Sequence, residues 1–201
     1  ADELEKADDL EAAAKKLVAD KLREHQRIIF NGNGYSEEWV KEAERRGLPN
    51  IKCMVDAVDY LATPENIEMF EKHGVMSKRE LVARGVVMYE NYAKQINIEA
   101  LTMIDMAKKE ILPAAAKYIK DIAKTAELAK SCGAETVFEE ETVKEISALV
   151  TEMYKALGTL EADVQKVHSI EDTQEMANYF HDTIFADMGA LRVPADKIET
   201  L

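Results

Sequence analysis

The feature that most constrains the fold is an uninterrupted apolar repeat in the last third of the chain. Apolar side chains recur there at alternating spacings of three and four: Val143, Ile146, Val150, Met153, Leu157, Leu160, Val164 and Val167. Such spacing places one continuous stripe of side chains along an α-helix. A stripe of this length has to pack against one or more long helices.

Helical patterns also flank this repeat. A capping box at Ser77–Glu80 opens a pattern that runs to Ile111. Pro113 is expected to kink the helix that follows, because proline lacks an N–H and clashes with the preceding turn. A last long helix is marked by Met176, Phe180, Ile184, Met188 and Leu191, and Val193-Pro194 is expected to interrupt it.

The first 75 residues read as shorter helical pieces. Residues 1–29 fit one amphipathic helix, and Phe30–Gly34 should break it, because Asn and Gly tolerate positive φ. Ser36 and Thr63-Pro64 then mark the starts of further short helices. The segment to Gly74 therefore predicts a group of small helices.

The predicted fold class is all-α, because no segment alternates with the period of two that a strand requires. A small-helix subdomain is followed by long antiparallel helices, as a kinked three-helix bundle or a helical hairpin. We predict a helix at 1–30 that continues from an upstream domain, the small-helix subdomain at 31–75, the long-helix bundle at 76–192 and a tail at 193–201. The abrupt helical start at Ala1, without Met or a cap, is expected of a segment of a longer protein.

The charge and the apolar content of the chain exclude some classes of binding partner. Asp and Glu number 39 against 26 Lys and Arg, and the net charge of −13 would repel a phosphate backbone, so we expect no nucleic acid partner. Two cysteines do not make a disulfide framework. No apolar run approaches the ~20 residues that span a bilayer, so we expect no membrane partner and a cytoplasmic location.

The histidines do not form a recognisable metal motif. Ferritin-like sites need Glu three residues before His. Leu22, Phe70, Gln165 and Asn178 stand three residues before His25, His73, His168 and His181. Metal ligands that converge from distant helices stay possible at this point, but we assign no metal ligand to this chain.

Other candidate chemistry also has a simpler structural reading. The Asn31–Gly34 loop follows a helix and lacks the lysine of a P-loop, which favours a turn over a phosphate cradle. Cys53 and Cys132 lack a basic neighbour in sequence that would activate a thiolate, and His181-Asp182 has no nucleophile nearby in sequence. We assign no catalytic and no cofactor-binding residue to the chain.

Two stretches carry a family resemblance. Residues 24–39, EHQRIIFNGNGYSEEW, and residues 95–115, QINIEALTMIDMAKKEILPAA, resemble the C-terminal region of type III glutamine synthetases. The resemblance implies a parent enzyme that makes glutamine from glutamate, ammonia and ATP with divalent metal (Mg or Mn), and that assembles as stacked rings. It implies that the metal ligands and ATP contacts lie upstream of Ala1. The implied partners are the chain's own upstream catalytic domain and neighbouring subunits.

The leading interpretation is a non-catalytic helical region of a glutamine synthetase that serves as scaffold, in assembly or in regulation. The alternative is an independent acidic helical module that binds a basic partner. A third is a self-contained enzyme or metal protein with a converged site. The apolar repeat at 143–167 can be buried within its own bundle or between subunits, and the sequence leaves both open.

Overall fold

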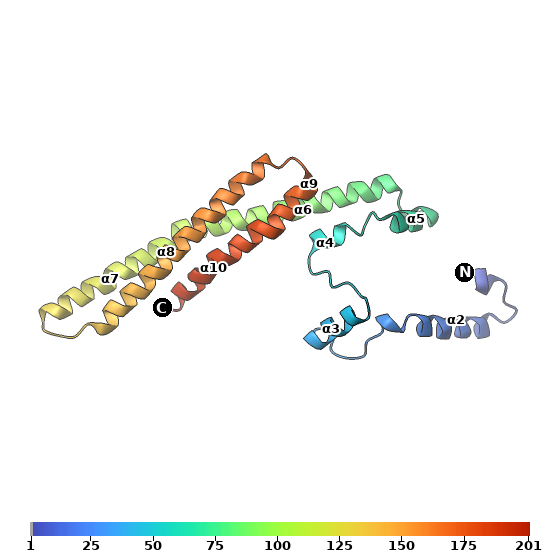
Figure 1. Ribbon diagram of the computed structural model, residues 1–201, viewed down its shortest axis with the longest axis horizontal. Coiled ribbons are helices and arrows are strands. Elements are labelled where there is room, and N and C mark those ends of the chain that lie inside the picture. Colours follow the sequence, from blue (N-terminus) through green and yellow to red (C-terminus); the bar gives the residue numbers. More distant parts are fainter. Residues whose placement is uncertain (1) are drawn as a thin grey trace. The chain divides into compact units, whose positions relative to one another are not determined.

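The structure is a computed structural model that describes residues 2–201, with side chains from Leu4 onward (Figure 1). Between residues 2 and 201 the regular structure is helical, with no strand, which confirms the predicted all-α class. The chain divides into two compact units, Ala1–Lys52 and Cys53–Leu201. The boundaries predicted at residues 30, 75 and 192 stay a prediction.

The first unit begins with two helices where one was expected. They are α1 (Asp2–Glu5) and α2 (Leu10–Glu24), followed by the 3₁₀ turn η1 (Gln26–Ile28). Ala1 lies outside the described residues, and over the others the prediction of a single helix is wrong. Asp9 is the reason, because its Oδ1 accepts a hydrogen bond from the Ala12 N–H at 3.0 Å and starts α2 afresh.

The break after η1 is confirmed, but its expected cause is wrong. Between residues 2 and 201 positive φ is confined to Gly47, Gly74 and Gly133, and so does not occur at Asn31–Gly34. The loop is instead shaped by Phe30, whose ring stacks on Trp39 at 4.1 Å between centroids. A Cβ on Gly32 would lie 2.5 Å from the Phe30 ring. Glycine is therefore needed here for space.

The end of this loop is tied to α3 (Glu37–Arg45). Ser36 caps α3 by accepting from the Trp39 N–H at 3.3 Å, as predicted. Arg46 lies 5.5 Å over the Trp39 ring and donates to the Ile29 carbonyl at 2.9 Å. These contacts make Asn31–Gly34 a structural turn.

The second unit is built from long helices, with two short ones, α4 (Met54–Val58) and α5 (Pro64–Lys72), packed on α6. The remaining elements are α6 (Lys78–Met106), η2 (Ala107–Ile111), α7 (Leu112–Ser131), α8 (Val137–Lys166), η3 (Val167–Ser169), α9 (Thr173–Tyr179), η4 (Phe180–Ile184) and α10 (Phe185–Glu199). Figure 1 shows α8 running antiparallel to α7 and α10, while α6 and α10 run in the same direction.

The apolar repeat of α8 forms the centre of the core. Its side chains are all buried or half-buried, and Met153, Leu157 and Leu160 are almost fully so. From Met153 to Val167 the side chains of the repeat pack in one cluster with residues of α6 and with Phe180 and Ile184 of η4. The repeat is thus buried within its own bundle, which leaves other faces for contacts with partners.

Pro113 and Pro194 both lie in continuous helical segments. The π-helix η2 ends at Ile111, two residues before Pro113. The helix therefore has one extra residue in the turn with which the proline ring interferes. The predicted interruption at Pro194 is wrong, because α10 continues through it to Glu199. Pro194 is fully buried, and packing of its ring compensates for the missing hydrogen bond.

No helix within residues 2–201 has the length and apolar character needed to cross a membrane.

Candidate functional site

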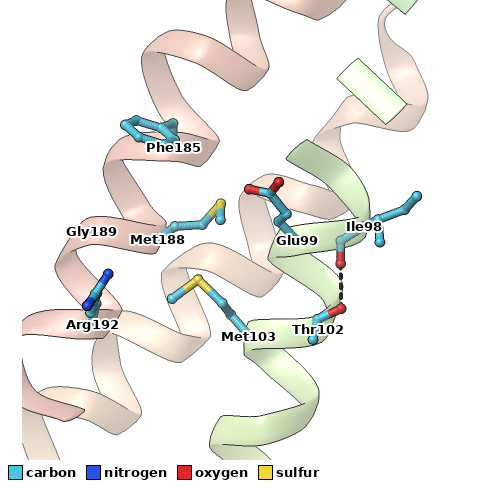
Figure 2. Close-up of a pocket in the computed structure, with 8 residues that line it drawn as sticks. All are labelled: Ile98, Glu99, Thr102, Met103, Phe185, Met188, Gly189 and Arg192. Carbon is cyan, nitrogen blue, oxygen red and sulfur yellow. Dashed lines mark hydrogen bonds between the residues drawn. The ribbon is translucent and has the colours of Figure 1, made fainter. Parts of the chain in front are cut away.

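An apolar groove lies between α6 and α10 in the second unit (Figure 2). Its volume is about 520 Å³, within the size range of ligand and docking sites. The lining comes from Ile98, Glu99, Thr102 and Met103 on α6 and from Phe185, Met188, Gly189 and Arg192 on α10. On α10 these residues follow the spacing i, i+3, i+4, i+7, which places them on one face of the helix.

The groove is open and apolar along its edges. Figure 2 shows Met103 and Met188 pointing toward each other across it. Ile98 is 63% exposed and Phe185 57% exposed, and both stand at the margins. Methionine side chains adapt to irregular partner surfaces, so this lining suits contact with another apolar surface.

The polar groups of the groove are already hydrogen-bonded within their own helices. Glu99 accepts from Gln95 Nε2 at 2.7 Å, and Arg192 Nε donates to Asp196 Oδ2 at 3.1 Å. Thr102 Oγ1 donates to the Ile98 carbonyl at 2.7 Å. The groove therefore offers an apolar floor with one negative and one positive group, an arrangement suited to binding and not to proton transfer.

A second feature is a pair of carboxyl groups between α8 and α10. Asp163 Oδ1 accepts from Lys166 Nζ at 2.5 Å and from the Tyr179 hydroxyl at 3.0 Å. The hydrogen bond from Lys166 lowers the pKa of Asp163. Burial, together with the neighbouring Asp163 carboxylate, raises the pKa of Asp187. Asp187 Oδ2 is buried and has no hydrogen-bond partner among residues 2–201.

The tyrosines of α6 anchor the short helices. The Tyr89 hydroxyl donates to Asp59 Oδ1 at 2.6 Å, and Gln174 Nε2 donates to the same oxygen at 2.7 Å. Burial and the Asp59 carboxylate raise the pKa of Tyr89. Burial and a hydrogen bond with Cys53 likewise raise the pKa of Tyr92. These contacts hold α4 and α9 against α6. They give the hydroxyl groups of Tyr89 and Tyr92 a structural function.

The histidine and the two cysteines considered as candidate reactive residues do not lie together in one site. His181 Nδ1 lies 2.8 Å from Asp182 Oδ1 in the π-helix η4, and the His181 ring centroid lies 6.3 Å from that of Tyr92. Cys53 is half-buried and Cys132 is exposed after α7. Across residues 2–201, no three His, Cys, Asp or Glu side chains are grouped so as to hold a metal ion. The absence of assigned site residues stays a prediction.

The groove itself escaped the sequence analysis, although a signal for it was present. Met176, Phe180, Ile184 and Met188 are separated by three successive spacings of four, which is longer than three α-helical turns of 3.6 residues. The extra residue is absorbed by η4, and this sets which face α10 turns to α6.

Comparison with known proteins identifies the family. Residues 13–130 match the family described as the glutamine synthetase C-terminal domain. A glutamine synthetase of Butyrivibrio fibrisolvens is 38% identical over 96% of this chain, and a type-3 glutamine synthetase of Dictyostelium discoideum is 26% identical over 94%. The chain spans only 28% and 26% of the length of these two relatives. The chain belongs to the glutamine synthetase C-terminal domain family.

Proposed function

We propose that this chain acts as the non-catalytic helical C-terminal part of a glutamine synthetase, where it contributes to scaffold and assembly. The parent activity is the ATP-dependent ligation of ammonia to glutamate, carried out by a catalytic region that precedes these residues. The observation that carries the proposal is the match over nearly the whole chain to about a quarter of a glutamine synthetase.

The proposal assigns the cofactors to a region outside this chain. ATP and Mg or Mn belong, in this proposal, to the upstream region. Residues 2–201 do not fit a metal ion, because they contain no suitable cluster of ligands. The Asn31–Gly34 loop does not fit a phosphate either, since the Phe30 ring occupies the space above Gly32.

The division predicted from sequence is part of the proposal. Residues 1–30, with α1 and α2, lead in from the catalytic domain, residues 31–75 and 76–192 form the small-helix and long-helix parts, and residues 193–201 are the C-terminal segment that includes the end of α10. Partners are then the chain's own upstream domain and neighbouring subunits. A cytoplasmic location follows from the same proposal.

A chimera tests this function. The corresponding segment of the Butyrivibrio fibrisolvens enzyme is replaced by this chain, and a second version lacks the part equivalent to 76–192. We expect the chimera to form glutamine and to assemble at the native mass, and we expect the deletion to lose the native assembly. An unchanged assembly after the deletion would contradict the proposed scaffold function.

An independent acidic module that binds a basic partner is the second candidate, supported by the net charge of −13. The reading frame upstream of the Ala1 codon separates the two. A β-rich catalytic region in that frame favours the synthetase, and an unrelated domain or a nearby start codon favours the module.

A further inference from the structure

We propose that the groove between α6 and α10 is a contact face between two copies of this chain, related by a two-fold axis. This inference rests on the proposed assembly function and names the surface and the partner. The partner is a second copy because the surface is complementary to itself in both charge and apolar character.

The margins of the groove are too exposed for a small buried ligand. Ile98 and Phe185 line the groove, yet both are more than half exposed. A small molecule on the floor would leave these side chains in water. A second protein surface would cover them, and exposed apolar patches of this kind mark protein contacts.

The charges of the groove complement each other under two-fold symmetry. Figure 2 places Glu99 and Arg192 at opposite ends of the groove, with Met103 and Met188 between them. A two-fold axis in the plane of the groove, perpendicular to the line from Glu99 to Arg192, exchanges the two ends. Arg192 then lies over Glu99 of the partner subunit, and the reverse contact forms at the same time. The methionines meet their own copies at the centre.

Gly189 is compatible with close approach of a second copy. It lies in the second turn of α10, where glycine weakens a helix relative to most residues. A Cβ at this position would meet no atom of residues 2–201 within 4 Å, so packing inside the chain does not require glycine. Gly189 is exposed and lines the groove, so a second copy can occupy the space beside it.

Charge reversal tests the contact in the 201-residue chain. In sedimentation velocity, we expect the native chain to self-associate, and Glu99→Arg and Arg192→Glu each to weaken association about tenfold or more, because both symmetry-related contacts become repulsive. An equimolar mixture of the two variants should regain native association, because each mixed dimer has two attractive pairs. Circular dichroism checks that the variants keep their helices.

Three outcomes would overturn the proposal. The first is a native chain that stays monomeric up to submillimolar concentration. The second is native self-association that neither reversal changes, and the third is a mixture of the two variants that fails to recover association. In the second case a surface elsewhere on the chain would hold the copies together.

Two helical glycines provide a matched pair of variants. Gly189 lies in the groove and Gly158 on α8, and a Cβ at either position has open space in this chain. Glutamine in place of either should raise the melting temperature of the chain by a few degrees, because it is a better helix former. Only Gly189→Gln should also weaken association. Equal association of Gly189→Gln and Gly158→Gln would contradict the contact.

This result is separable from the proposed function. If the charge reversals have no effect but the chimera is active and its deletion disrupts assembly, the scaffold proposal stands and the groove is wrong. If the chimera fails while the mixed variants still restore association, the groove stands as a contact of an independent module.

Discussion

At the scale of single residues, the carboxyl pair Asp163–Asp187 is the feature whose charge state the fold controls. Asp163 is stabilised as a carboxylate by Lys166 and Tyr179, and its pKa is lowered, while the pKa of Asp187 is raised by burial beside it. The fold therefore favours the charged form of Asp163 and disfavours the charged form of Asp187. A second negative charge there is costly because the Lys166 ammonium already serves Asp163.

The pair predicts a pH dependence of stability. Because folding raises the pKa of Asp187, its favourable contribution is complete below the unfolded-state pKa of about 3.9 and is lost as pH rises through the folded-state value. Asp187→Asn keeps a hydrogen-bond donor toward Asp163 without the second charge. We expect this variant to be more stable than the native chain near neutral pH, by on the order of 1 kcal/mol.

Thermal unfolding between about pH 3.5 and pH 7.5 measures this effect, because this range includes the unfolded-state pKa. The advantage of Asp187→Asn should shrink as pH falls toward the unfolded-state pKa, where native Asp187 is itself protonated. Asp121→Asn on the exposed face of α7 serves as the control, since Asp121 lies only in a loose 3.8 Å ion pair with Lys117. If the melting temperatures of the native chain and Asp187→Asn differed by the same amount at all pH values, the raised pKa of Asp187 would be contradicted.

At the scale of the elements, the stability of the bundle depends strongly on the buried apolar repeat of α8. Leu160 is fully buried in the main core cluster, whereas Tyr154, also on α8, is 68% exposed. We expect Leu160→Ala to lower the free energy of unfolding by about 2–5 kcal/mol through the cavity it leaves. Tyr154→Ala should change it by less than about 0.5 kcal/mol.

Chemical denaturation with urea compares these two variants. Equal destabilisation by both substitutions would mean that α8 is covered on both faces in solution. That outcome would place a partner on the outer face of α8 and not only in the groove.

The helices of the bundle could be predicted because each has a local cause. The α8 spacing and the Ser77–Glu80 capping box act within a few residues, and the structure has both as expected. The two wrong predictions, a single first helix and a break at Pro194, have different causes. The first depends on a local cap, and the second depends on packing with distant residues. Asp9 was not recognised as a cap, and Pro194 continues its helix only because the core buries its ring.

The groove could not be predicted from these patterns because it depends on the relative phase of two helices. Residues on α6 and α10 are about ninety positions apart, and their pairing depends on where η4 inserts its extra residue. Period analysis finds the apolar face of each helix separately. It does not show which part of that face the neighbouring helix leaves uncovered.

At the scale of the whole molecule, the two units are connected by an exposed segment without regular structure at residues 48–52. The second unit has its own core, so it should fold alone. We expect brief trypsin digestion to cut after Lys52 and to release Cys53–Leu201 with its melting temperature unchanged. Mass spectrometry identifies the fragment and circular dichroism gives its midpoint. A clear drop in the midpoint would show that residues 1–52 stabilise the bundle.

The end of α10 divides the second unit into regions of unequal thickness. Figure 1 shows α7 and α8 continuing beyond the C-terminus of α10 as a pair of helices. Toward the turn at 132–136, Leu128, Val137 and Phe138 are exposed, and the buried side chains are the small ones of Ala126 and Thr136. Opening this pair exposes little additional apolar surface, so it requires much less free energy than global unfolding. Backbone amides near the turn should therefore exchange with solvent through local fraying, long before those beside Phe180 exchange through cooperative unfolding of the bundle.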